Sequence, residues 1–138
     1  MKILIIEDEI PAAKRLEKLI FECRPGAEIL DVIDTVEDAL EWFENNDDPD
    51  LIISDIQLAD GISFEIYESV EIDCPIIFAT AYDEYAIKAF EVNAQDYLLK
   101  PVSAKRITLA LDNIRNKQEA GDLPKPILNN NDTVFVMI

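Results

Sequence analysis

The chain has 138 residues, with 12 Lys and Arg, 29 Asp and Glu and no His, which gives a formal net charge of −17. This length and a hydrophobic content of 49% predict one folded domain with a buried core, and they exclude a largely disordered chain. Neutralising nucleic-acid phosphates needs clustered Lys and Arg, so the charge excludes polyanion binding as the main task of this domain.

Basic residues are unevenly distributed along the chain. None lies between Arg24 and Lys88, a stretch of 63 residues that holds 18 of the 29 acids. From Lys88 to Lys117, six basic residues accompany only three acidic ones. An uneven, solvated surface is the plain interpretation. The alternative is that some acids form a cation site and that the late basic segment forms a separate contact face.

Missing side-chain types exclude further classes of site. Without His, the chain has no Ser-His-Asp or Cys-His catalytic centre, no His metal ligand and no phosphohistidine of its own. Cys23 and Cys74 lack the spacing of a zinc site, so we expect buried thiols in a reducing compartment. The first apolar run is too short for a signal-peptide core, and no run reaches membrane length. We therefore expect a cytoplasmic protein without a membrane segment.

Five apolar runs of strand length recur along the chain, at residues 3–6, 28–33, 51–53, 76–80 and 97–99. An amphipathic helical pattern follows each run, at residues 12–23, 35–43, 64–70, 85–92 and 103–114. Thr35, with Asp38 three residues later, is placed to cap the second helix, and Ser103 is placed to cap the fifth. Buried strands that alternate with amphipathic helices predict an α/β fold, with a parallel sheet covered on both faces.

Residues 120–138 differ in composition from the rest. They contain Gly121, Pro124 and Pro126, followed by three asparagines, which is typical of a linker. Residues 133–137 could begin another strand. We expect a globular domain at residues 1–119, followed by a linker that leads to a further unit.

Polar side chains follow four of the predicted strands. The first strand is followed by the acidic run 7–9, the third by Asp55, the fourth ends in Thr80, and the fifth is followed by Lys100. In an open parallel sheet, ligands bind at the carboxyl ends of the strands. These carboxylates, a hydroxyl and an ammonium group should therefore meet at one edge.

Such a set of groups suits a phosphoryl group and a hard cation. Mg²⁺ binds through one or two carboxylates and completes its shell with water and phosphate oxygens. Lys100 adds a positive charge, Thr80 adds a hydroxyl donor, and Asp55 is the best candidate for a nucleophile. Each residue alone has a plain structural interpretation, such as capping a helix. Their joint position at four strand ends favours the functional one.

The sequence resembles the receiver domain of two-component response regulators from Lys2 to about Lys117. The segments that carry the resemblance are 2–9, 51–61, 78–81 and 96–101. Residues 81–97 are similar to the subgroup whose receivers precede a LytTR DNA-binding domain, and Gln57-Leu58 fits that subgroup as well. The resemblance implies a flavodoxin-like (βα)5 fold, a doubly wound sheet of five parallel strands in the order 2-1-3-4-5.

The resemblance also implies a role for each acid at the site. Asp55 would accept a phosphoryl group from a histidine kinase or a phosphotransfer protein. Asp8, Asp55 and the backbone carbonyl of Gln57 would ligate Mg²⁺, with Glu7 acting through water. No other cofactor is implied. Such a domain catalyses only its own phosphorylation and dephosphorylation, so it is not an enzyme in the ordinary sense.

Other residues would respond to the phosphoryl group. Lys100 and Thr80 would contact its oxygens, and Tyr97 would swing inward as Thr80 moves. The Lys100–Pro101 bond would be cis, since only X–Pro bonds carry a small cis penalty. Gln57 and Tyr82 would lie near the attacking water and tune hydrolysis.

The implied output surface is formed by the fourth helix, the fifth strand and the fifth helix. By the same resemblance it would mediate homodimerisation, with bridges to acids of a second copy from Lys88, Lys105, Arg106, Arg115 and Lys117. DNA would be bound only by a C-terminal domain absent here, of which residues 120–138 would be the start.

Three alternatives remain at this point. The first is a binding module of receiver fold that signals without phosphorylation. The second is a metal-dependent phosphatase with an Asp nucleophile, which would need an acid where Gln57 stands. The third is a flavin-binding protein, which would want a phosphate loop rich in Ser, Thr and Gly where this chain has acids at 7–9.

Overall fold

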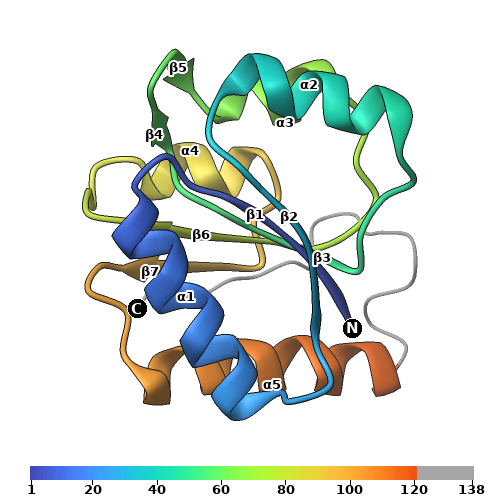
Figure 1. Cartoon of the computed structure of the whole chain (residues 1–138), viewed down its shortest axis with the longest axis vertical. Coiled ribbons are helices and arrows are strands. Elements are labelled where there is room, and N and C mark those ends of the chain that lie inside the picture. Colours follow the sequence, from blue (N-terminus) through green and yellow to red (C-terminus); the bar gives the residue numbers. More distant parts are fainter. Residues whose placement is uncertain (121–138) are drawn as a thin grey trace.

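A computed structural model describes residues 1–120 of the chain. Of the expected linker at residues 120–138, only Ala120 is described, and it is the last residue of a helix; the remainder, including the expected strand at residues 133–137, lies outside the described residues. Five parallel strands form one sheet in the order β2-β1-β3-β6-β7 (Figure 1). Their bounds are β1 Lys2–Ile6, β2 Glu28–Ile33, β3 Leu51–Ser54, β6 Ile76–Thr80 and β7 Asp96–Leu99. The predicted five-stranded parallel sheet and its order are therefore confirmed, with β6 and β7 as the fourth and fifth long strands.

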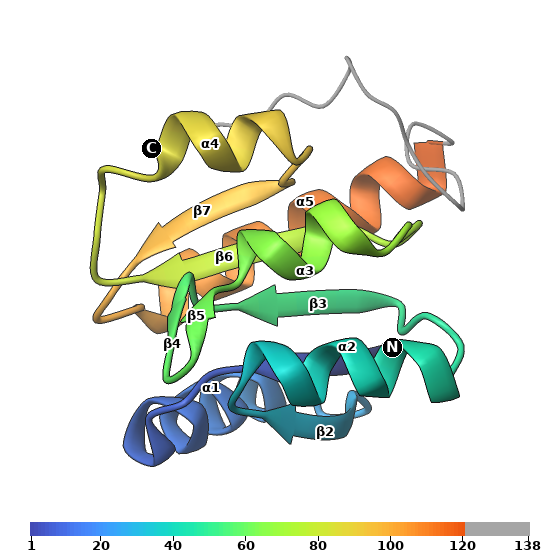
Figure 2. The ribbon, with the colours of Figure 1, turned by 90° about the horizontal axis from the view of Figure 1, so that it is seen from above.

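Five helices connect and cover the strands. Their bounds are α1 Ile10–Cys23, α2 Val36–Asn45, α3 Phe64–Ser69, α4 Ala86–Glu91 and α5 Ala104–Ala120. In Figures 1 and 2, α1 and α5 lie on one face of the sheet, and α2, α3 and α4 lie on the other. Within the described residues, no helix has the length and apolar character needed to cross a membrane.

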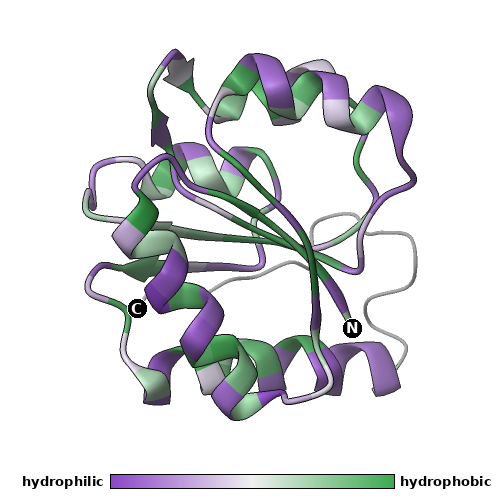
Figure 3. Cartoon of the chain, in the orientation of Figure 1, coloured by the Kyte–Doolittle hydropathy of each residue, from purple (hydrophilic) through white to green (hydrophobic). Residues whose placement is uncertain are grey.

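Each strand contributes side chains to two separate hydrophobic cores, because successive side chains of a strand point to opposite faces of the sheet. Ile3 and Ile5 of β1 pack in a cluster with α1 and α5, whereas Leu4 and Ile6 pack in a cluster with α2, α3 and α4. All four are fully buried. Burying a side chain of this size stabilises the fold by about 1.5–3 kcal/mol. The central strands are accordingly mostly hydrophobic in Figure 3.

Side-chain caps fix the starts of two helices as predicted. The Thr35 hydroxyl oxygen accepts a hydrogen bond from the Asp38 N–H at 3.0 Å, at the start of α2. The Ser103 hydroxyl oxygen accepts one from the Arg106 N–H at 3.1 Å, at the start of α5. Removing such a cap costs about 1 kcal/mol.

A short hairpin after β3 was not predicted. Its strands are β4 Gln57–Leu58 and β5 Gly61–Ile62, which pair antiparallel. Asp60 accepts hydrogen bonds from the backbone N–H groups of Val36 at 2.7 Å and Glu37 at 3.1 Å. These bonds lower the pKa of Asp60 below its ordinary value. The hairpin therefore supplies a second cap to α2, where the helix dipole favours an anion.

Candidate functional site

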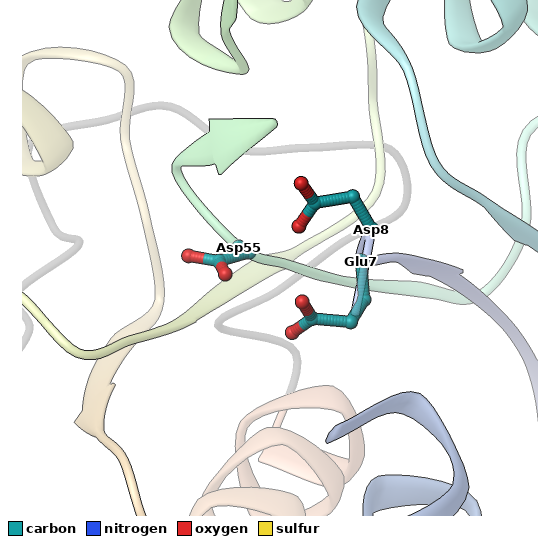
Figure 4. A group of neighbouring side chains, drawn as sticks. All are labelled: Glu7, Asp8 and Asp55. Carbon is teal, nitrogen blue, oxygen red and sulfur yellow. The ribbon is translucent and has the colours of Figure 1, made fainter. Parts of the chain in front are cut away.

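Three acids meet where β1 and β3 end. Glu7 and Asp8 follow β1 directly, and Asp55 follows the neighbouring strand β3. The Asp55 N–H donates to the carbonyl oxygen of Ile6 at 2.8 Å, which fixes the two strand ends against each other. One carboxylate oxygen from each of the three acids lies within 4.8 Å of the other two (Figure 4). The structure therefore brings the predicted acidic residues together.

Lys100 joins this cluster from the end of β7. Its Nζ lies 2.7 Å from Oε1 of Glu7 and 2.8 Å from Oδ2 of Asp55. The Lys100 N–H also donates to the carbonyl oxygen of Thr80 at 2.8 Å, which holds the lysine beside β6. The peptide bond between Lys100 and Pro101 is cis. One ammonium group thus bridges two of the three acids.

Burial shapes the charge of the site. The side chain of Glu7 is 4% exposed, that of Asp55 is 9% exposed and that of Lys100 is 19% exposed. Burial raises the pKa of Glu7, and the hydrogen bond from Lys100 only partly opposes this. Burial alone would lower the pKa of Lys100, but hydrogen bonds to Asp55 and Glu7 outweigh it and the pKa is raised. Lys100 therefore stays positively charged at neutral pH.

Hydrogen bonds on several sides hold Asp55 in place. Its Oδ1 accepts from the Ile56 N–H at 2.6 Å, and its Oδ2 accepts from Lys100. Its backbone carbonyl accepts from the hydroxyl groups of Ser54 and Ser63, both at 2.7 Å. Such fixation orients a carboxylate toward an incoming group at little further entropic cost.

Thr80 and Tyr97 meet at the segment after β6. Thr80 is fully buried at the end of β6, and its Oγ1 accepts from the Tyr82 N–H at 3.4 Å. Tyr97, on β7, is also buried, and its hydroxyl donates to the carbonyl oxygen of Tyr82. Burial raises the pKa of Tyr97 to about 12, so its hydroxyl remains a donor at neutral pH. A displacement of Thr80 would therefore be transmitted to Tyr97 through the two hydrogen bonds of the Tyr82 backbone.

Gln57 makes a contact that the sequence did not indicate. Its side-chain Nε2 donates to the hydroxyl oxygen of Tyr85 at 2.8 Å, between β4 and the start of α4. Tyr85 was expected only as a residue of the fourth helix. No local pattern could reveal this pair, because 28 residues separate its members.

The donor set fits Mg²⁺ better than a soft metal. Glu7, Asp8 and Asp55 offer hard carboxylate oxygens that lie close together. They are found at the edge of the sheet where β1 and β3 end. Mg²⁺ favours such oxygens and keeps water and phosphate ligands beside them. The residues present therefore fit a magnesium ion.

The raised pKa of Glu7 predicts a pH effect on stability without Mg²⁺. Between the ordinary carboxyl pKa of 4.5 and the raised value, the folded chain holds a proton on Glu7 that the unfolded chain has released. This stabilising contribution is complete below pH 4.5 and is lost as the pH rises through the raised pKa. We expect Glu7→Gln to remove this part of the pH dependence, measured as the free energy of unfolding by urea in EDTA across that range. Parallel curves for the two proteins would contradict the assignment.

The sequence is similar to known proteins over most of its length. A family model described as response regulator receiver domain matches residues 3–112. The chain is 41% identical over 123 residues to the sensory transduction protein LytT of Bacillus anthracis, a match that covers 87% of this chain and 49% of that protein. It is 38% identical over 125 residues to the transcriptional regulatory protein LytR of Staphylococcus aureus strain N315, covering 88% and 50% respectively. The chain thus spans about half the length of the curated relatives it matches.

A solved structure shares the same fold. The response regulatory domain of protein mrkE from Klebsiella pneumoniae superposes with a TM-score of 0.75 at 34% sequence identity, covering 87% of this chain and 99% of that one.

Proposed function

This chain belongs to the family of response regulator receiver domains of two-component systems, and we propose that phosphorylation of Asp55 in the presence of Mg²⁺ switches it. The observation that carries the proposal is the cluster of Glu7, Asp8 and Asp55, two of which Lys100 bridges. Domains of this family act in signalling and are not classical enzymes. Membership of the family decides against the phosphatase and flavin-binding alternatives.

The chemistry is a transfer from a phosphohistidine of a kinase or a phosphotransfer protein. A carboxylate oxygen of Asp55 forms a bond to phosphorus, and the phosphorus–nitrogen bond breaks with its electron pair left on the imidazole. Asp8, Asp55 and the Gln57 carbonyl would hold Mg²⁺, with Glu7 acting through water. When bound, the ion neutralises charge on the phosphoryl oxygens. Lys100 stabilises the same charge, and the Thr80 hydroxyl donates to one oxygen.

The phosphoryl group would bias the surface formed by α4, β7 and α5. Thr80 drawn toward the phosphoryl group would displace Tyr82, whose carbonyl accepts from Tyr97 on β7. Tyr97 is thereby linked to the site by two hydrogen bonds. A shift of the equilibrium from 1:99 to 99:1 takes about 5.5 kcal/mol of differential stabilisation.

Chemical phosphorylation tests the proposal directly. Incubation with acetyl phosphate and Mg²⁺ is expected to add one phosphoryl group per chain, measured by intact-protein mass spectrometry. EDTA should abolish the addition, because the charge on the phosphoryl oxygens is then poorly compensated. Absence of labelling in Mg²⁺ would contradict the proposal and favour a receiver fold that signals without phosphorylation.

The α4-β7-α5 surface is also the proposed homodimer interface. Its elements expose Ile87, Leu99 and Leu109, with exposed fractions of 77%, 50% and 50%. Most of its basic residues already have partners within the chain, which include Glu68 and Glu91 for Lys88, Asp96 for Arg106 and Asp112 for Arg115. Dimerisation would therefore bury apolar area and exchange some of these ion pairs.

Analytical ultracentrifugation provides the measurement of dimerisation. We expect the sedimenting mass to double when beryllofluoride, a phosphoryl mimic, and Mg²⁺ are added. Leu109→Glu should prevent the doubling, because it buries a charge in the interface. Equal masses with and without beryllofluoride would refute phosphorylation-driven dimerisation.

Output is proposed to lie outside this domain. The relatives are about twice as long, and the one from Staphylococcus aureus is described as a transcriptional regulatory protein. We propose that a C-terminal LytTR-type domain binds DNA in the cytoplasm and that this receiver controls it. The net charge of −17 fits a receiver that does not itself bind DNA.

A further inference from the structure

The side chains of Gln57 and Tyr85 connect two loops that flank the acidic cluster. Gln57 lies two residues after Asp55 on β4, and Tyr85 directly precedes α4. Their hydrogen bond, 2.8 Å from Nε2 to the phenol oxygen, spans 28 residues of sequence. A polar contact of this separation links the phosphoacceptor loop to the segment after β6.

Tyr85 is held firmly enough to serve as an anchor. Its ring packs edge-on against Phe64, with centroids 6.0 Å apart, and against Tyr82, with centroids 6.1 Å apart. Phe64, the first residue of α3, is itself buried in the core. The segment is held at a second point, where the carbonyl of Tyr82 accepts from the Tyr97 hydroxyl. The phenol oxygen of Tyr85 therefore has a defined position relative to the sheet.

The hydrogen bond to Tyr85 uses only the nitrogen end of the Gln57 side-chain amide. A glutamine amide has donor hydrogens on nitrogen and an acceptor oxygen. Since Nε2 is engaged by Tyr85, Oε1 is left as the end that can accept a hydrogen bond from water. A side chain fixed in this way orients a water molecule with less loss of rotamer freedom than a free glutamine.

We propose that Tyr85 is a positioning residue for hydrolysis of the phosphoryl group on Asp55, acting through the Gln57 amide. This inference rests on the proposed function. In the reaction, the water oxygen forms a bond to phosphorus, and the bond from phosphorus to the Asp55 oxygen breaks with its electron pair left on the carboxylate. The proton of the water is released to solvent with the inorganic phosphate. Gln57 Oε1 accepts a hydrogen bond from the attacking water and orients it.

A double-mutant cycle on the phosphorylated chain tests the proposal. The chain is phosphorylated with acetyl phosphate and Mg²⁺, desalted into Mg²⁺ buffer, and its decay is followed by intact-protein mass spectrometry. Tyr85→Phe keeps the ring contacts and removes only the hydroxyl. We expect it to lengthen the half-life about threefold, the order of effect of one neutral hydrogen bond. In a Gln57→Leu background, the same change should have no effect.

Tyr67→Phe is the matched control. It also removes one phenol hydroxyl, in this case a buried one on α3 that forms no hydrogen bond with Gln57. We expect the half-life of this variant to equal that of the unsubstituted chain. Thermal unfolding of each variant confirms that the decay is measured on folded protein.

Two outcomes would overturn the inference alone. One is an unchanged half-life in Tyr85→Phe, and the other is an equal lengthening with Gln57 and with Leu at position 57. Failure of the unsubstituted chain to become labelled would instead contradict the proposed function, and with it this inference.

Discussion

Replacing Asp55 with asparagine is expected to abolish Mg²⁺-dependent phosphorylation by acetyl phosphate. An amide has nearly the shape of a carboxylate but lacks the negative charge that makes the oxygen a nucleophile. The variant should still fold, because most hydrogen bonds of Asp55 can also form with an asparagine. These are the bond from the Ile56 N–H to the side-chain oxygen and the bonds from two serine hydroxyls to the backbone carbonyl. Intact-protein mass spectrometry after incubation measures the loss.

Asp47→Asn provides the matched control for this variant. Asp47 is exposed in the segment between α2 and β3, at the end of β3 opposite to Asp55. The same change of charge at that position should leave labelling intact. Undiminished labelling of the Asp55→Asn variant would rule out Asp55 as the acceptor.

Replacing Lys100 with methionine is expected to have the next largest effect. The positive charge on Nζ of Lys100 offsets the charges of Glu7, at 2.7 Å, and Asp55, at 2.8 Å. No other residue within 1–120 forms an ion pair with either acid. Loss of Lys100 removes one preorganised charge from the phosphoryl site, which should slow labelling by about 10²–10³-fold. Without Mg²⁺ it should also destabilise the fold by about 2 kcal/mol, less than for a fully buried pair because Lys100 keeps some exposure.

Two measurements separate these effects of Lys100→Met. Labelling kinetics in saturating Mg²⁺ report the loss at the phosphoryl site. Urea unfolding in EDTA and in Mg²⁺ reports stability, which Mg²⁺ should partly restore because the ion supplies the missing positive charge. Lys105→Met, an exposed lysine on α5, should change neither quantity. A labelling rate within threefold of the unsubstituted chain would refute the role of Lys100.

The long elements of the fold could be predicted because their patterns are strong. Continuous apolar runs such as 3–6 and 51–53 become strands buried on both faces, and the helices between them bury one apolar side each. Parallel strands with right-handed crossovers place all carboxyl ends on one edge. The convergence of Glu7, Asp55 and Lys100 was therefore predictable from their positions after strands.

What escaped prediction depends on contacts between distant segments. The strands β4 and β5 have two residues each, too few for any periodicity to be visible. Asp60 caps a helix that begins 24 residues earlier, and Gln57 meets Tyr85 across 28 residues. The bidentate pair of Arg106 with Asp96 depends on how α5 is rotated against β7. For this reason the sequence did not indicate that several basic side chains between Lys88 and Lys117 form ion pairs within the chain.

The central claim is that Asp55 itself carries the phosphoryl group, and chemical trapping tests it most directly. Borohydride reduces an aspartyl phosphate to homoserine, so peptide mass spectrometry of the labelled and reduced chain identifies the acceptor. We predict homoserine at position 55 after labelling in Mg²⁺, and unmodified aspartate there after labelling in EDTA. Homoserine at Asp8, or a labelled chain with intact aspartate at position 55, would contradict the account.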